Sequence, residues 1–482
     1  MIEKRVRTLL SIEYENRLLI HEKNSFSRVF DYTQMLIDAG YEVILYNDIE
    51  AFRLTYENKL RGTKTKAAII SCCHMYIPYD IKTAFYEIEL SLDALYPKLN
   101  SAVLVEHLND IELIDYVYDS LYEDQKTEDQ TSRFIERKVL TKVAIAPFIA
   151  ARDADLLEEA KSASSYLDWI GIAKKNAKLS VYAASIGTER SPLDIDMEFE
   201  RFIFDGYQKL SGVVTKNAPS ILPKAIDMIA GGKIALIVAD GMSLFDFEIV
   251  SKHFSGFEYD YNCSFAMIPT TTSISRQSLL SGKYPQQLSD PFSLTKEESG
   301  FYDAASGHGY TKQQAFYARG YDSLPGPLVR FATIIINDID DMVHGQMQGR
   351  QGMYNDVTLF AKTGRLQGLI SSLLESGFSV YLTADHGNAH CVGGGSTKRT
   401  GVETETKSKR MIVLKDFAEI SDDLSDRTIV YPGYYMDKSY QYLICKGNTS
   451  FDNKSNDVMT HGGISIEEVI VPFIKIRSKH NG

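Results

Sequence analysis

The chain has 482 residues, of which 44% are hydrophobic and 24% charged, values typical of a soluble globular protein with more than one domain. Its formal net charge of -12 argues against a surface that grips nucleic acid or anionic lipid along its length. A small metal-bearing site for a phosphorylated substrate is compatible with this charge. The five cysteines lack the spacing of a zinc ribbon or a disulfide framework. There is also no apolar run of membrane-spanning length and no signal-peptide pattern, so we expect a cytoplasmic protein without a membrane partner.

Residues 1–104 are predicted to form a small N-terminal α/β module, with strands near 18–20, 42–46 and 67–72 separated by helical segments. This part contains no glycine-rich phosphate-binding motif, so we interpret it as a binding or docking module. Residues 105–220 are predicted to be mostly helical. Turn-forming residues before 233 indicate that a catalytic domain occupies 221–482.

In the catalytic domain, strand candidates alternate with helical segments. They lie at 233–239, 314–318, 331–337, 378–384, 410–414 and 471–476. This alternation predicts an α/β fold, with a mostly parallel sheet flanked by helices.

The first candidate site residue is Asp240, which directly follows the apolar run Ile234–Ala239. A continuous apolar run of this length is typical of a strand buried on both faces, and ligands bind outside the carboxyl ends of such strands. An aspartate at this position is most often a turn or cap residue. The metal-site interpretation gains weight because later strand ends carry similar side chains.

A run of hydroxyl residues, Thr270 to Ser273, precedes a helical segment that leads to Gly282. Such a run often caps a helix. A hydroxyl at a helix N-terminus is also suited to phosphoryl transfer, because the helix attracts phosphate and a metal lowers the pKa of the hydroxyl.

Two further strand ends and one loop supply carboxylates and imidazoles. Asp340 and His344 are four residues apart and therefore share one face of a helical turn. Together the segments predict two sites for zinc-like ions. The first set is Asp240, Thr272, Asp385 and His386; the second is Asp340, His344 and His461.

The motifs in this order resemble the alkaline phosphatase superfamily. ALIVADGMS, PTTTSISRQSLLSGKYP, INDID, LTADHGN and THGGISIEEVIVPFI are most similar to the PglZ domain of BREX-type phage-defence proteins. The resemblance covers about residues 220 to 478. It implies an alkaline-phosphatase-like fold and phosphoric ester hydrolysis with two divalent ions, Zn²⁺ first and Mn²⁺ as the alternative. Defence-system proteins, contacted through the N-terminal region, are the implied partners.

The resemblance also implies roles for single residues. Thr272 would be the nucleophile, with Thr271 as its rival, and Arg276 would contact a substrate phosphate unless it forms a structural salt bridge. The family usually has a glycine just before the histidine of the third motif, where this chain has Val343. That departure leaves Asp341 as an alternative ligand to Asp340. His390 is an extra candidate ligand.

Three functions remain open on the sequence. The first is a phosphodiesterase or phosphatase acting on nucleotide or oligonucleotide phosphoesters in an antiphage system, a substrate class that rests on the resemblance. The second is a phosphomonoesterase or phosphomutase of the same superfamily, although 282–331 is short for the inserted cap domain of a mutase. The third is a defence component that acts by binding alone.

Overall fold

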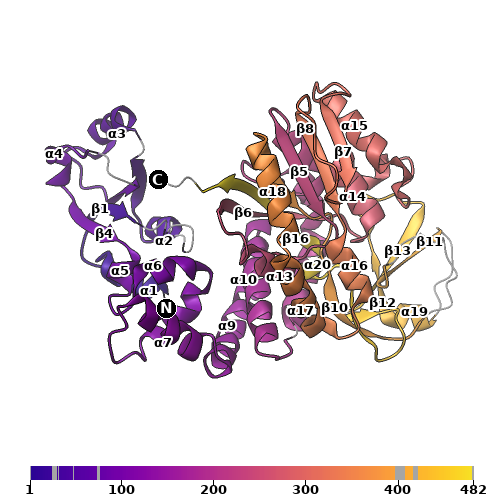
Figure 1. Ribbon diagram of the computed structural model, residues 1–482, viewed down its shortest axis with the longest axis horizontal. Coiled ribbons are helices and arrows are strands. Elements are labelled where there is room, and N and C mark those ends of the chain that lie inside the picture. Colours follow the sequence, from indigo (N-terminus) through magenta and orange to yellow (C-terminus); the bar gives the residue numbers. More distant parts are fainter. Residues whose placement is uncertain are drawn as a thin grey trace. The chain divides into compact units, whose positions relative to one another are not determined.

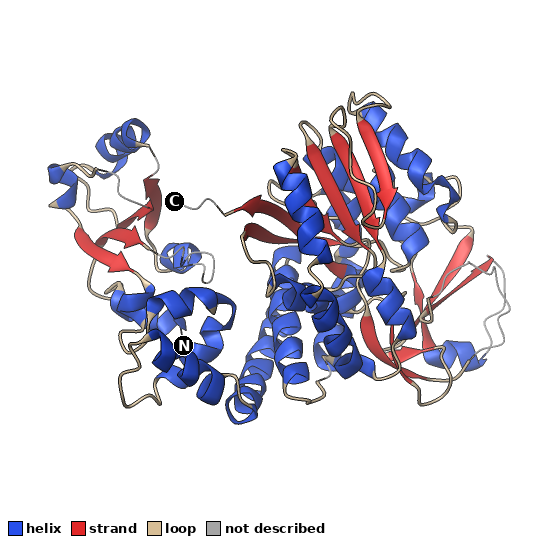
Figure 2. Cartoon of the chain, viewed as in Figure 1, coloured by secondary structure: helices blue, strands red, loops and turns tan. Residues whose placement is uncertain are grey.

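The structure of the chain is a computed structural model, and it describes residues 2–23, 26, 30, 32–46, 48–72, 76–190, 192–396, 408–415 and 422–479. It divides into two compact units, Met1–Ala150 and Ala151–Gly482, each with a hydrophobic core of its own. Both units contain helices and strands (Figure 2). The three-part division with boundaries at 104 and 220 stays a prediction.

The first unit is built on a four-stranded parallel sheet in the order β2-β3-β1-β4. Its strands are β1 (Arg17–Glu22), β2 (Glu42–Tyr46), β3 (Ala67–Cys72) and β4 (Tyr86–Leu90). Its helices are α1 (Ile2–Leu9), α2 (Tyr32–Asp38), α3 (Ile49–Thr55), α4 (Tyr79–Lys82), α5 (Leu92–Leu95), α6 (Ser101–Glu106), α7 (Ile111–Tyr118) and α8 (Glu128–Phe134). The sequence pattern missed β4, an edge strand in which Glu87 and Glu89 interrupt the apolar run.

The second unit is organised around a six-stranded sheet in the order β6-β16-β9-β5-β8-β7 (Figure 1). The strands are β5 (Ile234–Ala239), β6 (Phe257–Phe265), β7 (Ala315–Arg319), β8 (Phe331–Ile336), β9 (Ser379–Thr383) and β16 (Ile470–Ser478). Strands β9, β5, β8 and β7 are mutually parallel, and only β16 runs against its neighbours β6 and β9. The predicted α/β fold with a mostly parallel sheet is confirmed.

Helices cover this sheet (Figure 1). Every residue of β5 and β8 is buried, as expected for strands that are packed on both faces. The helices of the unit are α9 (Lys142–Ser162, which begins in the first unit), α10 (Tyr166–Ser185), α11 (Leu193–Asp205), α12 (Ala225–Ile229), α13 (Leu244–Ser251), α14 (Thr272–Ser281), α15 (Glu297–Gly307), α16 (Asp338–Gly345), α17 (Gly349–Lys362), α18 (Arg365–Glu375), α19 (Asp422–Arg427) and α20 (Ile466–Val469). Apolar side chains of α13, α14, α15, α17 and α18 join β5 and β8 in one core. Within the described residues, no helix is both long and apolar enough to cross a membrane.

Two small sheets lie between β9 and β16 in the chain. One has the order β14-β10-β15 and the other β11-β13-β12. Their strands are β10 (Ala389–Gly393), β11 (Met411–Lys415), β12 (Thr428–Tyr431), β13 (Tyr440–Cys445), β14 (Thr449–Ser450) and β15 (Asp457–Thr460). The strand predicted at 410–414 therefore exists, as β11, but it pairs with β13 in a separate antiparallel sheet. Its length resembles that of a central strand, and nothing in the apolar run itself distinguishes the two kinds of sheet.

Candidate active site

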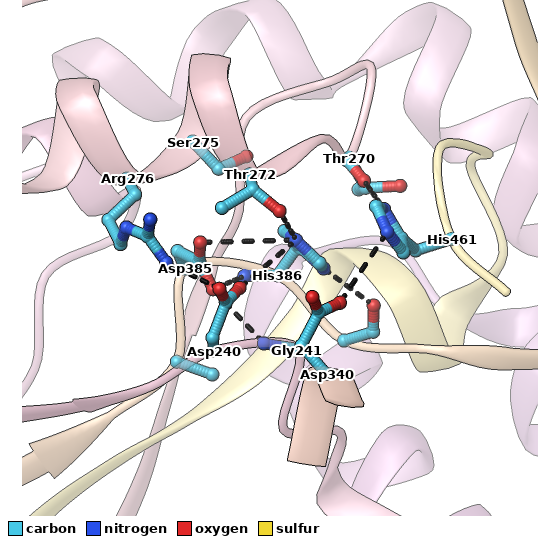
Figure 3. A network of polar contacts seen from close by, with 12 residues as sticks. Asp240, Gly241, Thr270, Thr272, Ser275, Arg276, Asp340, Asp385, His386 and His461 are labelled. Atoms are coloured by element: carbon cyan, nitrogen blue, oxygen red, sulfur yellow. Dashed lines mark hydrogen bonds and ion pairs between the residues drawn. The ribbon is translucent and has the colours of Figure 1, made fainter. Parts of the chain in front are cut away.

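The polar side chains predicted from the strand ends gather at the carboxyl edge of the six-stranded sheet. Asp240 follows β5, Asp340 lies in α16 after β8, and Asp385 follows β9. Because β16 is antiparallel to β9, the chain that leads into it, including His461, also lies at this edge. The chain leaving β6 reaches the same edge and enters α14 at Thr272. Figure 3 shows these residues around one another.

Asp240, Asp385 and His386 form one group of three ligand atoms that lie within 4.8 Å of one another. The Nε2 atom of His386 is 3.7 Å from Oδ1 of Asp240 and 3.9 Å from Oδ2 of Asp385. All three side chains are buried. Asp385 also accepts a hydrogen bond from the backbone N–H of Gly241 at 3.2 Å, and Gly241 has a φ of 72°, a conformation that favours glycine.

Asp340, His344 and His461 form a second group of the same kind. The Nε2 atom of His344 is 3.2 Å from Oδ1 of Asp340 and 3.4 Å from Nε2 of His461, and the third separation, His461 to Asp340, is 3.7 Å. Nitrogen and oxygen ligands bound at ~2.1 Å around a tetrahedral ion are separated by about 3.4 Å. The geometry of the three atoms therefore fits one zinc-like ion. It favours Asp340 over the alternative Asp341, whose side chain is exposed.

The two buried imidazoles are each held in one tautomer by a backbone carbonyl. Nδ1 of His386 donates to the carbonyl of Gly387 at 2.9 Å, and Nδ1 of His461 donates to the carbonyl of Thr270 at 2.9 Å. Because the proton is on Nδ1 in both rings, the lone pair of each Nε2 faces the carboxylates. This arrangement is typical of histidines that bind metal.

Buried carboxylate oxygens in both groups lack partners, which tests whether cations fit here. Among the described residues, Oδ1 of Asp240, Oδ1 of Asp340 and Oδ2 of Asp385 accept no hydrogen bond. Burial and the adjacent Asp385 raise the pKa of Asp240 well above its usual value, although Arg276 opposes this shift. Buried charge without compensation is costly, so the donor set fits two divalent ions, one at each group.

Of the two candidate nucleophiles, Thr272 faces the metal-ligand groups. Its Oγ1 donates to Nε2 of His386 at 3.0 Å (Figure 3). Its side chain also lines a cavity of about 250 Å³. Thr271 occupies the N-cap position of α14 without a side-chain capping hydrogen bond, is fully buried, and does not line the cavity. The geometry favours Thr272.

Arg276 is buried beside the first group and makes two ion pairs. Its guanidinium donates to Oδ2 of Asp240 and, through Nε, to Oε2 of Glu297 at 2.7 Å. Only 1% of its side chain is exposed. The salt-bridge alternative for Arg276 therefore has direct support, and the orientation of Asp240 depends on it. Glu297, the first residue of α15, was not identified from the sequence because no motif surrounds it.

Glu468 holds the loop that carries His461. One carboxylate oxygen accepts the N–H of Gly463 at 2.8 Å, and the other is paired with the buried Arg410. The backbone carbonyl of Glu468 accepts the N–H of Gly387 at 2.8 Å, beside His386. One residue thus fixes the chain next to both His386 and His461. The sequence contains a signal for it, since Ser465 and Glu468 form a capping box at α20.

His390 does not join either group. Its Nε2 is paired with Oδ1 of Asp457, and it lies beside Asp196, Arg350 and Glu467. The cavity near the two groups is lined instead by Asp240, Thr272, Ser273, Arg276, Phe292, Leu294, Arg319, Asn337, Asp340, Asp341, His344 and His461. Arg319 was missed from the sequence, although its position at the end of a predicted strand is the signal that identified Asp240.

We predict that Glu297→Gln lowers the free energy of unfolding of the metal-free protein by about 3–5 kcal/mol. The variant removes the carboxylate that compensates the buried guanidinium of Arg276. Urea unfolding followed by circular dichroism measures the change. Glu298→Gln is the matched control, because Glu298 is the next residue of α15 but is exposed, and we expect a change within about 0.5 kcal/mol. Equal effects of the two variants would contradict the prediction.

The metal-free protein is also predicted to lose stability as the pH falls, in part through His461. Burial and the nearby His386 lower the pKa of His461 from 6.5 to about 3, although Asp340 opposes the shift. Between these values the unfolded chain binds a proton that the folded protein does not, so folding becomes less favourable as the pH falls through this window.

His461→Asn cannot take up this proton. The difference in unfolding free energy between wild type and His461→Asn should therefore become less favourable to wild type from pH 7 to pH 4, measured by urea unfolding in EDTA. If the unfolding free energies of the two proteins change equally between pH 7 and pH 4, the prediction is wrong, because the imidazole of His461 would then titrate in the folded protein as it does in the unfolded one.

Comparison with known proteins identifies the domain that carries these groups. A family model described as the BREX system PglZ alkaline phosphatase-like domain matches residues 224–476, just over half of the chain. A search of curated proteins finds no match.

Solved structures give distant matches. Murine ectonucleotide pyrophosphatase/phosphodiesterase 5 is 13% identical, with a TM-score of 0.36 over 50% of this chain and 88% of that chain. Phosphonoacetate hydrolase from Sinorhizobium meliloti 1021, in complex with phosphonoformate, is 11% identical, with a TM-score of 0.32 over 52% of this chain and 92% of that chain. The family resemblance expected from the motifs is confirmed by the family model: the chain belongs to the PglZ family of BREX systems and is a phosphoric ester hydrolase with an alkaline phosphatase-like domain.

Proposed function

We propose that this protein is a metal-dependent phosphodiesterase or phosphatase with Thr272 as its nucleophile. Its substrates are nucleotide or oligonucleotide phosphoesters, and its setting is a BREX-like antiphage system, with defence proteins as partners of the N-terminal region. The observation that carries the proposal is the position of one hydroxyl next to two groups of buried carboxylates and imidazoles.

Each group would hold one divalent ion. Asp240, Asp385 and His386, with Thr272, would bind the first, and Asp340, His344 and His461 the second. The mixed imidazole and carboxylate donors suit Zn²⁺, with Mn²⁺ as the alternative. When bound, two such ions stabilise charge on the oxygens that attack and leave in an in-line displacement.

The chain's own residues orient the reacting groups. Thr272 Oγ1 forms a bond to phosphorus while the bond from phosphorus to the leaving alcohol breaks, giving a phosphothreonine or its ester. Water then cleaves the Oγ1–phosphorus bond, which releases phosphate or its monoester and restores the hydroxyl. Thr272 is the first residue of the ten-residue α14, so the unpaired N–H groups of the first helical turn lie where phosphoryl oxygens bind. Arg276 contributes by fixing Asp240.

We predict that Thr272→Ala lowers kcat for phosphoester hydrolysis at least about 10³-fold, because Oγ1 of Thr272 contacts His386 and faces the cavity. Thr271→Ala is the matched control and should retain hydrolysis within about tenfold, since Thr271 does not line the cavity. Phage protection is measured in parallel in cells. Protection that survives Thr272→Ala while hydrolysis is lost would support the alternative of a defence component that acts by binding.

Metal removal is predicted to abolish hydrolysis. EDTA should reduce turnover to background, and Zn²⁺ or Mn²⁺ should restore it, because three buried carboxylates have oxygens that accept no hydrogen bond and are open to a cation. The assay compares bis-p-nitrophenyl phosphate with p-nitrophenyl phosphate. Preference for the diester is expected, and preference for the monoester would favour a phosphomonoesterase or phosphomutase. Full activity in EDTA would contradict the metal-dependent proposal.

A further inference from the structure

We infer that Arg319 binds a second, non-scissile phosphate of the substrate and so selects substrates that carry more than one phosphate. The inference rests on the proposed function, since it concerns the same cavity. It starts from a contrast between the two arginines that line that cavity, Arg276 and Arg319.

Arg276 is committed to two buried ion pairs. Its guanidinium is held between Asp240 and Glu297, and its side chain is 1% exposed. A guanidinium bound on two sides by buried carboxylates loses both pairs if it turns toward a ligand, at a cost that one phosphate contact does not offset. Recognition of a substrate anion therefore falls to another cation.

Arg319 is positioned for that contact. It is the last residue of β7, so it lies at the same carboxyl edge of the sheet as Asp240, and 46% of its side chain is exposed. Its Nε donates to the hydroxyl of Tyr317 at 3.0 Å and its Nη2 donates to Oε1 of Glu297 at 3.0 Å. Among the described residues nothing accepts a hydrogen bond from Nη1. One edge of the planar guanidinium is thus fixed by protein, and the other is open for the two-oxygen contact that arginine makes with phosphate.

The order of the charges places this contact beyond the scissile phosphate. From the first group outward the side chains are Asp240, Arg276, Glu297 and Arg319, each paired with the next. Two side chains, Arg276 and Glu297, separate Arg319 from Asp240 in this series. An anion on Arg319 is therefore a neighbouring phosphate of the same substrate, and the phosphate that reacts at Thr272 is a different one.

Glu297 makes the open edge of Arg319 a fixed feature. It is 2% exposed and also accepts from the hydroxyl of Tyr317, so the carboxylate cannot turn away from the two arginines. Holding the guanidinium in place before the substrate arrives reduces the entropy lost on binding.

The test compares two ligands that differ by one phosphate. Thymidine 5′-monophosphate and thymidine 3′,5′-bisphosphate are titrated calorimetrically into the Zn²⁺-loaded full-length protein carrying Thr272→Ala, which cannot form the Oγ1–phosphorus bond. We expect the bisphosphate to bind about tenfold more tightly. Adding Arg319→Gln should reduce this preference to about threefold or less. Arg319→Lys keeps the positive charge but lacks the planar pair of N–H donors, so it should give an intermediate preference.

Arg365→Gln is the matched control. Arg365 is also an exposed, ion-paired arginine, with 55% of its side chain exposed and Asp338 as its partner, but it does not line the cavity. Its substitution should leave the preference unchanged. Equal weakening of both ligands by Arg319→Gln, or no preference in the parent protein, would overturn the inference.

Kinetics separate this inference from the proposed function. The parent enzyme with Thr272 is given the p-nitrophenyl ester of thymidine 5′-phosphate, with and without a 3′-phosphate. The 3′-phosphate should lower KM about tenfold, and Arg319→Gln should remove this advantage while changing the kcat ratio of the two esters less than about twofold. If the parent hydrolyses neither ester, the proposed function fails, and the calorimetric preference still decides the role of Arg319.

Discussion

Negative charge removed from water at one edge of a sheet is the constraint on which this structure depends. Asp240, Asp340 and Asp385 are all buried there, and each has an oxygen that accepts no hydrogen bond from the described residues. Hydrophobic packing of β5 and β8 stabilises the sheet but does nothing for these carboxylates. Their compensation comes from Arg276 on one side and, by our proposal, from two divalent ions.

Buried ion pairs on both sides of the site then fix its geometry. Arg276 with Glu297 restrains Asp240, and Arg410 with Glu468 restrains the loop of His461. Such pairs add little net stability, because desolvation offsets most of their attraction. These pairs instead fix the orientation of the side chains. Any other orientation would leave a buried charge unpaired, so each side chain has one orientation of low energy. Catalytic groups gain from this kind of support, since small displacements reduce rates strongly.

The sequence allowed prediction of the candidate site residues that directly follow an apolar strand. Asp240 and Asp385 follow apolar runs, and the rule that ligands lie outside the carboxyl ends of parallel strands placed them together. Glu297 follows no strand, and its partners come from α14 and β7, so only the folded chain identifies it. The run at 410–414 was placed in the wrong sheet because pairing partners are set by tertiary contacts. Arg319 was overlooked although the same strand-end rule applied to it.

The chain from His386 to His461 leaves the site along β10 and returns along β15. These strands pair antiparallel, with Ala389, three residues after His386, opposite Thr460, which directly precedes His461. This pairing limits the spacing of the two histidines at the base of a two-stranded ribbon. Ser408 and Arg410, which precede β11, also contact this base, through the carbonyl of His461 and through Glu468. A change in the length of the β11–β13 segment would therefore preserve the arrangement of the two histidines only if both contacts are kept.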